Sequence, residues 1–179
     1  DLSFEDSPCS FLSFSKQTIA INGFSKYFAM TGWRLGYMIT PKEWMSAADR
    51  MHQNLMISAT EFVQEAGISV LQKSKVYCEK MKAEFNRRRI FVLKRMRELG
   101  MDPGYTPTGA FYVFYKYSDS SKTSLNLCHE VLEKTGVAIA PGLDFGAMGE
   151  GYIRLSYAQS MENIDRALTK LVDSKLLTS

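Results

Sequence analysis

Two cations eight positions apart, Lys26 and Arg34, are the residues of this 179-residue chain with the most distinctive chemistry. Lys26 follows an apolar stretch and has Phe24 and Phe28 close by in the sequence, so we expect its amine to be partly desolvated. Desolvation favours a neutral, nucleophilic lysine, which can form a Schiff base with an aldehyde. Arg34 offers a planar fork of donors that suits a phosphate group.

The spacing brings these two groups back to one neighbourhood, because the residues between them fit a short excursion between two strands. Gly32 and Gly36 would let the backbone approach a ligand closely. An amine for an aldehyde together with an arginine for a phosphate describes pyridoxal phosphate. The plainer interpretation, an exposed turn lysine and an unrelated surface arginine, stays open on spacing alone.

Composition excludes several classes of protein. The formal net charge is +3 and no basic run alternates with aromatic residues, so nucleic-acid binding is not expected. No apolar run reaches the roughly 18 residues of a membrane helix, and the polar first ten residues do not form a signal peptide. Cys9, Cys78 and Cys128 lie far apart, which indicates reduced thiols in a cytoplasmic protein. His52 and His129 are isolated, so no zinc site is predicted.

The first part of the chain is predicted to hold two strands and two helices. Residues 16–23 read as a short buried strand and residues 33–40 as a second strand, which Arg34 would open. Thr40 is the expected N-cap of a helix that continues to about residue 57. Thr60 can cap a further helix, whose apolar positions are Phe62, Val63, Ala66, Val70 and Leu71.

A long amphipathic helix over 75–99 follows and is the expected hinge between two units. Gly100 ends it, and its apolar stripe consists of Phe85, Val92, Met96 and Leu99. The three arginines at 87–89 are interpreted as a solvated face of this helix.

The last part is predicted to have a strand–helix–strand–strand–helix order. The strands are 110–117, 137–142 and 152–158, and one helix covers about 122–135 with Leu125, Cys128 and Leu132 turned inward. Ser160 caps a final helix whose apolar positions are Ile164, Ala167, Leu168, Leu171 and Val172. The segment 142–151 is rich in glycine but lacks the GxGxxG pattern, so it is expected to be a flexible loop.

Arg154 is a third candidate. Strand alternation places Ile153 and Leu155 on one face and Tyr152, Arg154 and Ser156 on the other. From the residues alone, an arginine on the wet face of an antiparallel strand is the simpler interpretation.

Three blocks of sequence resemble one family. The first is Gly23-Phe24-Ser25-Lys26, Ala29-Met30 and Gly32-Trp33-Arg34-Leu35-Gly36; the others are PTGAFYVF (107–114) and residues 136–168. The first block closely resembles the lysine signature of the class I and II aminotransferases, which are fold-type-I enzymes dependent on pyridoxal phosphate. The resemblance implies an α/β fold, the C-terminal part of the pyridoxal-phosphate-dependent transferase fold with an incomplete large domain. Residues 1–75 would then belong to the large domain and 76–179 to an α+β small domain.

The resemblance also implies roles for the three cations. Lys26 matches the lysine that condenses with the cofactor and then shuttles a proton, Arg34 the arginine on the cofactor phosphate, and Arg154 the arginine that pairs with the substrate α-carboxylate. It implies amino acid and 2-oxo acid substrates and a homodimer. Many relatives have a phosphate-contacting serine where Gly23 stands, so Ser25 is a weak substitute.

Several expectations concern what the chain lacks. It opens without methionine, and the family's aspartate and tyrosine partners of the cofactor lie upstream of the matched lysine, so we expect a fragment with negligible transaminase activity by itself. Alternatives left open are a fold-type-I lyase or decarboxylase, and the aminotransferase-like effector domain of a transcription regulator. The substrate cannot be identified from these residues.

Overall fold

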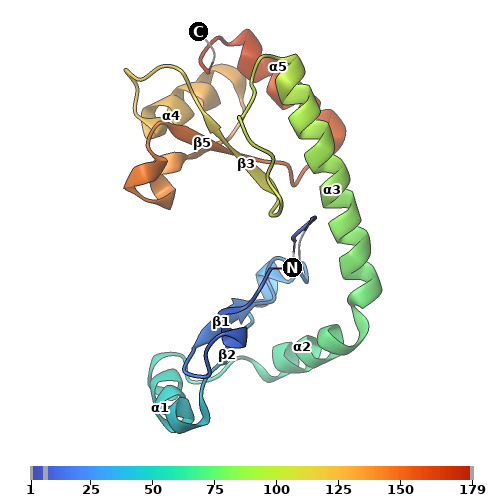
Figure 1. Cartoon of the computed structure of the whole chain (residues 1–179), viewed down its shortest axis with the longest axis vertical. Helices are drawn as coiled ribbons and strands as arrows, with labels where there is room; N and C mark the ends of the chain where they lie inside the picture. The colour runs from blue at the N-terminus through green and yellow to red at the C-terminus, as the bar shows by residue number, and fades with distance from the viewer. Residues whose placement is uncertain (1, 6–7, 178–179) are drawn as a thin grey trace. The chain divides into compact units, whose positions relative to one another are not determined.

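The computed structural model describes residues 2–5 and 8–177 and divides the chain into two compact units. Unit 1 contains the described residues 8–81, and unit 2 contains residues 2–5 and 82–177. The long helix α3 (Lys75–Glu98), green in Figure 1, begins in unit 1 and ends in unit 2. Within the described residues there is no helix long and apolar enough to cross a membrane and no cluster of metal-ligating side chains.

Unit 1 is built around a β-hairpin followed by two helices. Strand β1 (Ala20–Gly23) pairs antiparallel with β2 (Gly36–Ile39), with Gly23 opposite Gly36. A 3-10 turn (Lys42–Trp44) leads into α1 (Met45–Leu55), and α2 (Glu61–Lys73) follows. Another 3-10 turn (Phe11–Ser13) precedes the hairpin.

Several predictions for unit 1 are wrong in detail. The strands are shorter than expected, and the first is not buried, because Ile21 is 81% exposed among the described residues. Arg34 does not open the second strand; it lies in the turn before it. Thr40 does not cap a helix, and its buried hydroxyl oxygen has no hydrogen-bond partner among the described residues. Thr60 does precede α2, although its side chain makes no capping hydrogen bond.

The packing of unit 1 centres on a helical glycine. A Cβ on Gly67 of α2 would lie 2.5 Å from Cδ2 of Leu35 and 3.6 Å from the ring of Phe24. The helix therefore contacts both residues that flank the loop between the two strands. The buried apolar residues of unit 1 are few: Phe24, Met30, Val63 and Cys78.

Unit 2 contains a three-stranded antiparallel sheet in the order β3–β5–β4. Its strands are β3 (Tyr112–Lys116), β4 (Ala140–Pro141) and β5 (Tyr152–Ser156). In both β3 and β5 alternate residues are buried, as the sequence pattern of β5 predicts. The N-terminal segment joins this unit, because the amide of Phe4 donates to the carbonyl of Thr108 at 2.8 Å and that of Ala110 to Leu2 at 2.9 Å.

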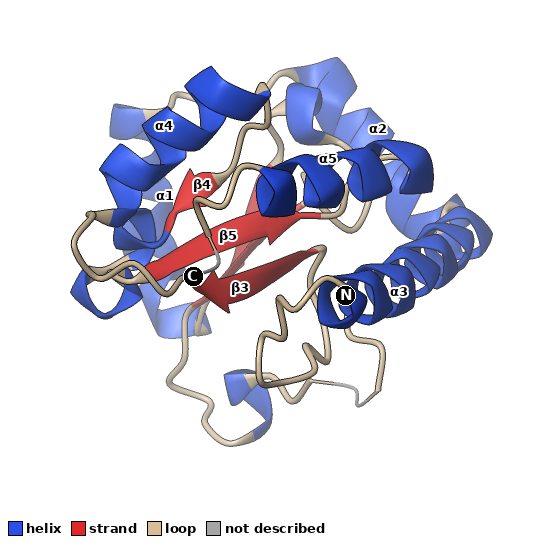
Figure 2. Cartoon of the chain, turned by 90° about the horizontal axis from the view of Figure 1, so that it is seen from above, coloured by secondary structure: helices blue, strands red, loops and turns tan. Residues whose placement is uncertain are grey.

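Helices α4 (Ser124–Thr135) and α5 (Met161–Asp173) lie on the same side of this sheet (Figure 2). Ser160 caps α5 by accepting from the amide of Asn163, and Gly136 ends α4 at a φ of 69°, both as predicted. The buried core joins the C-terminal half of α3 to the sheet and these helices: Val92, Leu93, Met96, Met101, Val113, Tyr115, Tyr117, Leu127, Cys128, Val131, Ile153, Leu155, Tyr157, Ile164, Leu168, Leu171 and Leu177.

Two predictions for unit 2 need correction. Leu125 and Leu132 are exposed, whereas Cys128 is buried as predicted, together with Leu127 and Val131 of the same helix. Arg89 is buried rather than solvated: it bonds the carbonyl of Pro107 at 2.6 Å and the carboxylate of Glu5 at 2.9 Å.

Candidate functional site

The loop over residues 24–35, here called the cation loop, joins β1 to β2 and carries both Lys26 and Arg34. Backbone hydrogen bonds close it, from Phe24 to the carbonyl of Leu35 at 3.1 Å and from Met30 to that of Phe24 at 3.3 Å. Phe24 at the start of the loop and Met30 near its middle are buried. The loop is therefore a defined turn and not an open excursion.

Lys26 lies at the start of a tight turn within this loop. Its carbonyl accepts a hydrogen bond from the amide of Ala29 at 3.1 Å, and Ala29 has a positive φ of 54°. The lysine is exposed, so the predicted partial desolvation is wrong for the described residues. Ser25 is half-buried and its carbonyl accepts from Thr31 Oγ1 at 2.9 Å; a role for its hydroxyl stays a prediction.

Arg34 is held in a conformation that the sequence did not predict. Its backbone is left-handed, with φ 53° and ψ 42°, a region that non-glycine residues seldom adopt without a structural reason. Its Nη1 donates to the carbonyl of Thr31 at 2.8 Å, which fixes the side chain against its own turn. Among the described residues no carboxylate forms an ion pair with Arg34, so its charge is uncompensated there.

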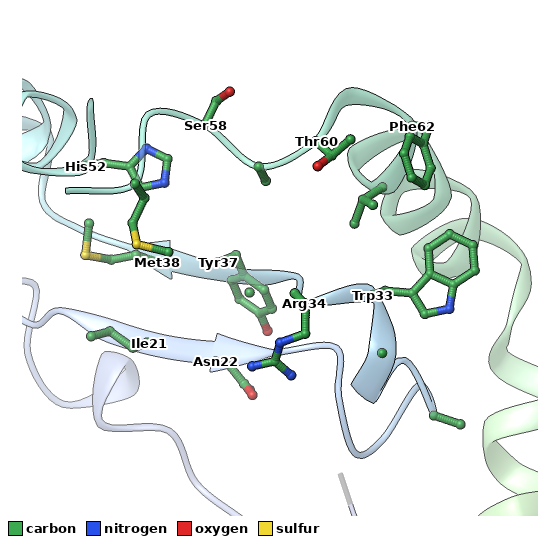
Figure 3. Close-up of a pocket in the computed structure, with 16 residues that line it drawn as sticks. Ile21, Asn22, Trp33, Arg34, Tyr37, Met38, His52, Ser58, Thr60 and Phe62 are labelled. Carbon is green, nitrogen blue, oxygen red and sulfur yellow. The ribbon is translucent and has the colours of Figure 1, made fainter. Parts of the chain in front are cut away.

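Arg34 is one of the residues that line a groove of about 1040 Å³. Figure 3 shows this groove with Arg34, Asn22 and Tyr37 of the hairpin region on one side, and Ser58, Thr60 and other residues after α1 on the opposite side. A fixed, unpaired cation at the edge of a groove is suited to a phosphate. Arg34 and the exposed amine on the same loop therefore fit pyridoxal phosphate.

Arg154 lies on the open face of the unit 2 sheet. Two rings lie against its guanidinium, those of Tyr112 and Phe145, and both of these rings also contact Phe114. Its Cζ lies 4.7 Å from the ring centroid of Phe145 and 5.2 Å from that of Tyr112. Its Nε is buried and has no hydrogen-bond partner within the described part of the chain. Buried donors in proteins are nearly always hydrogen-bonded, and a carboxylate is a suitable acceptor for an arginine.

Sequence reasoning missed the residues that position these cations. Tyr112 could have been found, because it alternates with the buried Val113 and so shares a face with Phe114, the register partner of Arg154. Thr31 and Phe145 carry no such signal: they contact the arginines through a turn and a loop whose conformations the residue pattern does not encode.

Comparison with known proteins gives a consistent result. The sequence profile of the family described as aminotransferase class I and II matches residues 1–171. An aspartate aminotransferase of Pyrococcus horikoshii is 40% identical over 158 residues, covering 87% of this chain and 40% of the relative. Aromatic-amino-acid aminotransferase 2 of Thermococcus litoralis is 38% identical over 161 residues, with the same coverage.

Solved structures agree with these matches. The crystal structure of an aromatic aminotransferase from Pyrococcus horikoshii superposes with a TM-score of 0.88 at 34% identity, covering 97% of this chain and 48% of that chain. The chain thus spans roughly two fifths to one half of the proteins it matches.

Proposed function

The chain belongs to the class I and II aminotransferases, and on this premise we propose that the protein containing it transfers an amino group between an amino acid and a 2-oxo acid, with pyridoxal phosphate as its cofactor. The single observation that supports this most is the cation loop. It presents an exposed lysine together with an arginine that is locked in a left-handed turn and unpaired among the described residues.

Three residues have roles in this proposal. Arg34 would hold the cofactor phosphate through its guanidinium, and the amine of Lys26 would hold the cofactor's aldehyde group. When bound, the cofactor supplies an electron sink for the charge left on the substrate's α-carbon. Once the substrate's amine has replaced Lys26 on the cofactor, the released Nζ of Lys26 would remove and return the proton at that carbon, and Arg154 would hold the substrate's α-carboxylate.

The names of the relatives favour amino transfer over the lyase and decarboxylase alternatives, since the relatives described above are named aminotransferases. No feature of the described residues favours an effector domain of a transcription regulator. We further propose a homodimer in the cytoplasm. The dimer rests on the family, and the location is supported by the three cysteines, which are free thiols.

The test uses the full-length gene product that contains this chain, loaded with pyridoxal phosphate. Reduction with borohydride fixes the cofactor to the lysine that binds it, and peptide mass spectrometry identifies that lysine. We expect the mass on Lys26, and we expect Lys26→Ala to lower turnover of amino acid plus 2-oxo acid by about 10²–10⁴-fold. The control is Lys42→Ala, at another exposed lysine, which should leave turnover unchanged.

Two further measurements sharpen the proposal. Arg34→Gln should weaken cofactor binding about 10- to 100-fold, the value of a charged hydrogen bond. The 179-residue chain by itself should show negligible turnover, because its unit 1 leaves so much apolar surface exposed. Cofactor trapped on a different lysine in the full-length protein would refute the assignment of Lys26.

A further inference from the structure

We propose that Phe145 is a positioning residue for Arg154: its ring covers one face of the guanidinium and leaves the donors at the guanidinium edge to the substrate carboxylate. The proposal rests on the proposed function, because it requires Arg154 to bind a carboxylate. The proposal adds to that function a residue, Phe145, and the loop that carries it, which Glu150 anchors. Together they would determine how Arg154 binds the carboxylate.

The first support is the state of Arg154 itself. A cation near aromatic ring faces gains electrostatic attraction, which increases where water is excluded. Here two rings lie within 4.7 and 5.2 Å of Cζ, one from Phe145 and one from Tyr112. Yet Nε is buried and has no partner within the described residues. The rings therefore hold the guanidinium in place without using its donors, which remain available to a ligand.

The second support is how Phe145 reaches Arg154. Phe145 ends a 3-10 turn (Gly142–Phe145), and its ring packs edge-on against Phe114 with centroids 5.2 Å apart. Phe114 is the register partner of Arg154 across β3 and β5. The ring thus contacts both members of one cross-strand pair, although about half of its surface is exposed. A phenylalanine that serves only to fill a core would be buried.

The third support is the anchoring of the loop over residues 142–151. The carboxylate of Glu150 accepts hydrogen bonds from the amide of Ser124 at 2.6 Å, from the Ser124 hydroxyl at 3.1 Å and from the Tyr117 hydroxyl at 3.0 Å. The Ser124 hydroxyl in turn accepts from the amide of Leu143 at 3.3 Å. Both arms of the loop are therefore tied to the start of α4, and the loop is not the free flap that its glycines suggest.

The interior of the loop is equally constrained. A Cβ on Gly142 would collide with the backbone oxygen of Gly149, so the two arms touch through bare backbone. Met148, in the 3-10 turn Ala147–Gly149 of the same loop, is 92% exposed. Met148 is a matched control for Phe145, because it lies in the same loop and is of similar size but has no aromatic ring.

The experiment compares Phe145→Leu, Phe145→Tyr and Met148→Ala in the loaded full-length protein. Leucine keeps apolar bulk but has no ring face, so we expect KM for the amino acid and for 2-oxoglutarate to rise about two- to thirtyfold with kcat within about twofold. Tyrosine keeps the ring and should restore KM, and Met148→Ala should match the parent. A residue with a merely structural role would lower the active fraction and kcat without this selective change in KM.

A spectroscopic measurement tests the same idea without turnover. The Nε–H proton of Arg154, assigned by its loss in Arg154→Lys, should exchange slowly with water and shift when 2-oxoglutarate is added. In Phe145→Leu it should exchange faster. If Phe145→Leu leaves both KM and this proton unchanged while Arg154→Lys raises KM, the role of Phe145 is refuted and the proposed function stands. If Arg154→Lys leaves KM unchanged, the carboxylate role of Arg154 fails as well.

Discussion

The two units of this chain bury their apolar side chains to very different extents. Among the described residues, seventeen form one continuous buried core in unit 2, whereas the buried apolar side chains of unit 1 are Phe24, Met30, Val63 and Cys78. Unit 1 instead exposes large apolar side chains over its hairpin and helices, among them Ile21, Met38, Leu55, Ile57 and Phe62. A soluble domain seldom leaves so much contiguous apolar surface uncovered, so such a surface indicates a binding or packing partner.

This difference shows which parts of the fold position each cation. Arg154 lies on a sheet whose other face is backed by a complete core, so its setting is established by unit 2 itself. Lys26 and Arg34 lie on a loop fixed by backbone hydrogen bonds and by the packing of Phe24 and Leu35 on α2. That loop is well defined, but the hairpin that carries it has little else beneath it among the described residues.

The largest expected effect comes from removing apolar side chains in the two units of the 179-residue chain. Leu127→Ala opens a cavity at a fully buried position and should cost about 2–5 kcal/mol, read from amide hydrogen exchange in β3 and β5. Ile21→Ala removes an exposed side chain and should cost about 0.5 kcal/mol or less, read from exchange in β1 and β2. Similar costs at the two positions would remove the contrast between the units.

The same contrast explains which parts of the fold could be predicted from the sequence. In unit 2 the information is local: Ser160 caps a helix, Gly136 ends one, and alternation along β5 separates Ile153 from Arg154. The buried face of α4 could not be predicted, because apolar residues occupy both candidate faces. Packing selects Leu127 and Val131, and Leu125 stays exposed.

In unit 1 the predictions failed where they depended on neighbours. An apolar stretch such as 16–23 reads as a buried strand, but burial requires a second layer that the described residues of unit 1 do not provide for Ile21. No periodic pattern in the sequence marks the left-handed turn at Arg34. Glycine is the residue that usually occupies such a conformation, but position 34 is an arginine. The candidate cations could be chosen from the sequence, but the turns and hydrogen bonds that fix their conformations could not be predicted from it.

Arg89 connects the N-terminal segment to unit 2, and its position in the helix sequence could have predicted its burial. It lies four residues after Phe85 and three before Val92, on the apolar stripe of α3. Its guanidinium bonds Glu5 and Pro107, and its Cζ lies 5.0 Å from the ring of Phe4, so it ties the N-terminal segment to unit 2. Arg89→Ala should therefore cost about 2 kcal/mol of stability, since it removes a buried guanidinium together with its hydrogen bonds to Glu5 and Pro107.

The neighbouring Arg87 is the matched control for this change. Its ion pair with Glu84 is largely exposed, so Arg87→Ala should cost much less stability than Arg89→Ala. Chemical denaturation followed by the near-ultraviolet signal of unit 2 measures both variants, and proteolysis near residue 5 reports release of the segment. Equal costs for the two arginines would show that the buried contacts of Arg89 add nothing to unit 2.

The smallest expected effect is a pH dependence confined to unit 2. Hydrogen bonds lower the pKa of Glu150, chiefly the one from the Ser124 amide, followed by those from Tyr117, the Gly151 amide and the Ser124 hydroxyl. Because the folded pKa lies below the unfolded value of roughly 4.3, ionised Glu150 stabilises the fold above that pH, and this contribution is lost as the pH falls through the folded pKa. Glu150→Gln should therefore be less stable than the parent at neutral pH, and the gap should close on acidification. Glu133→Gln, at an exposed glutamate on helix α4, controls for the loss of a charge. A gap that stays constant from neutral to acidic pH would mean that the carboxylate does not anchor the loop through its charge.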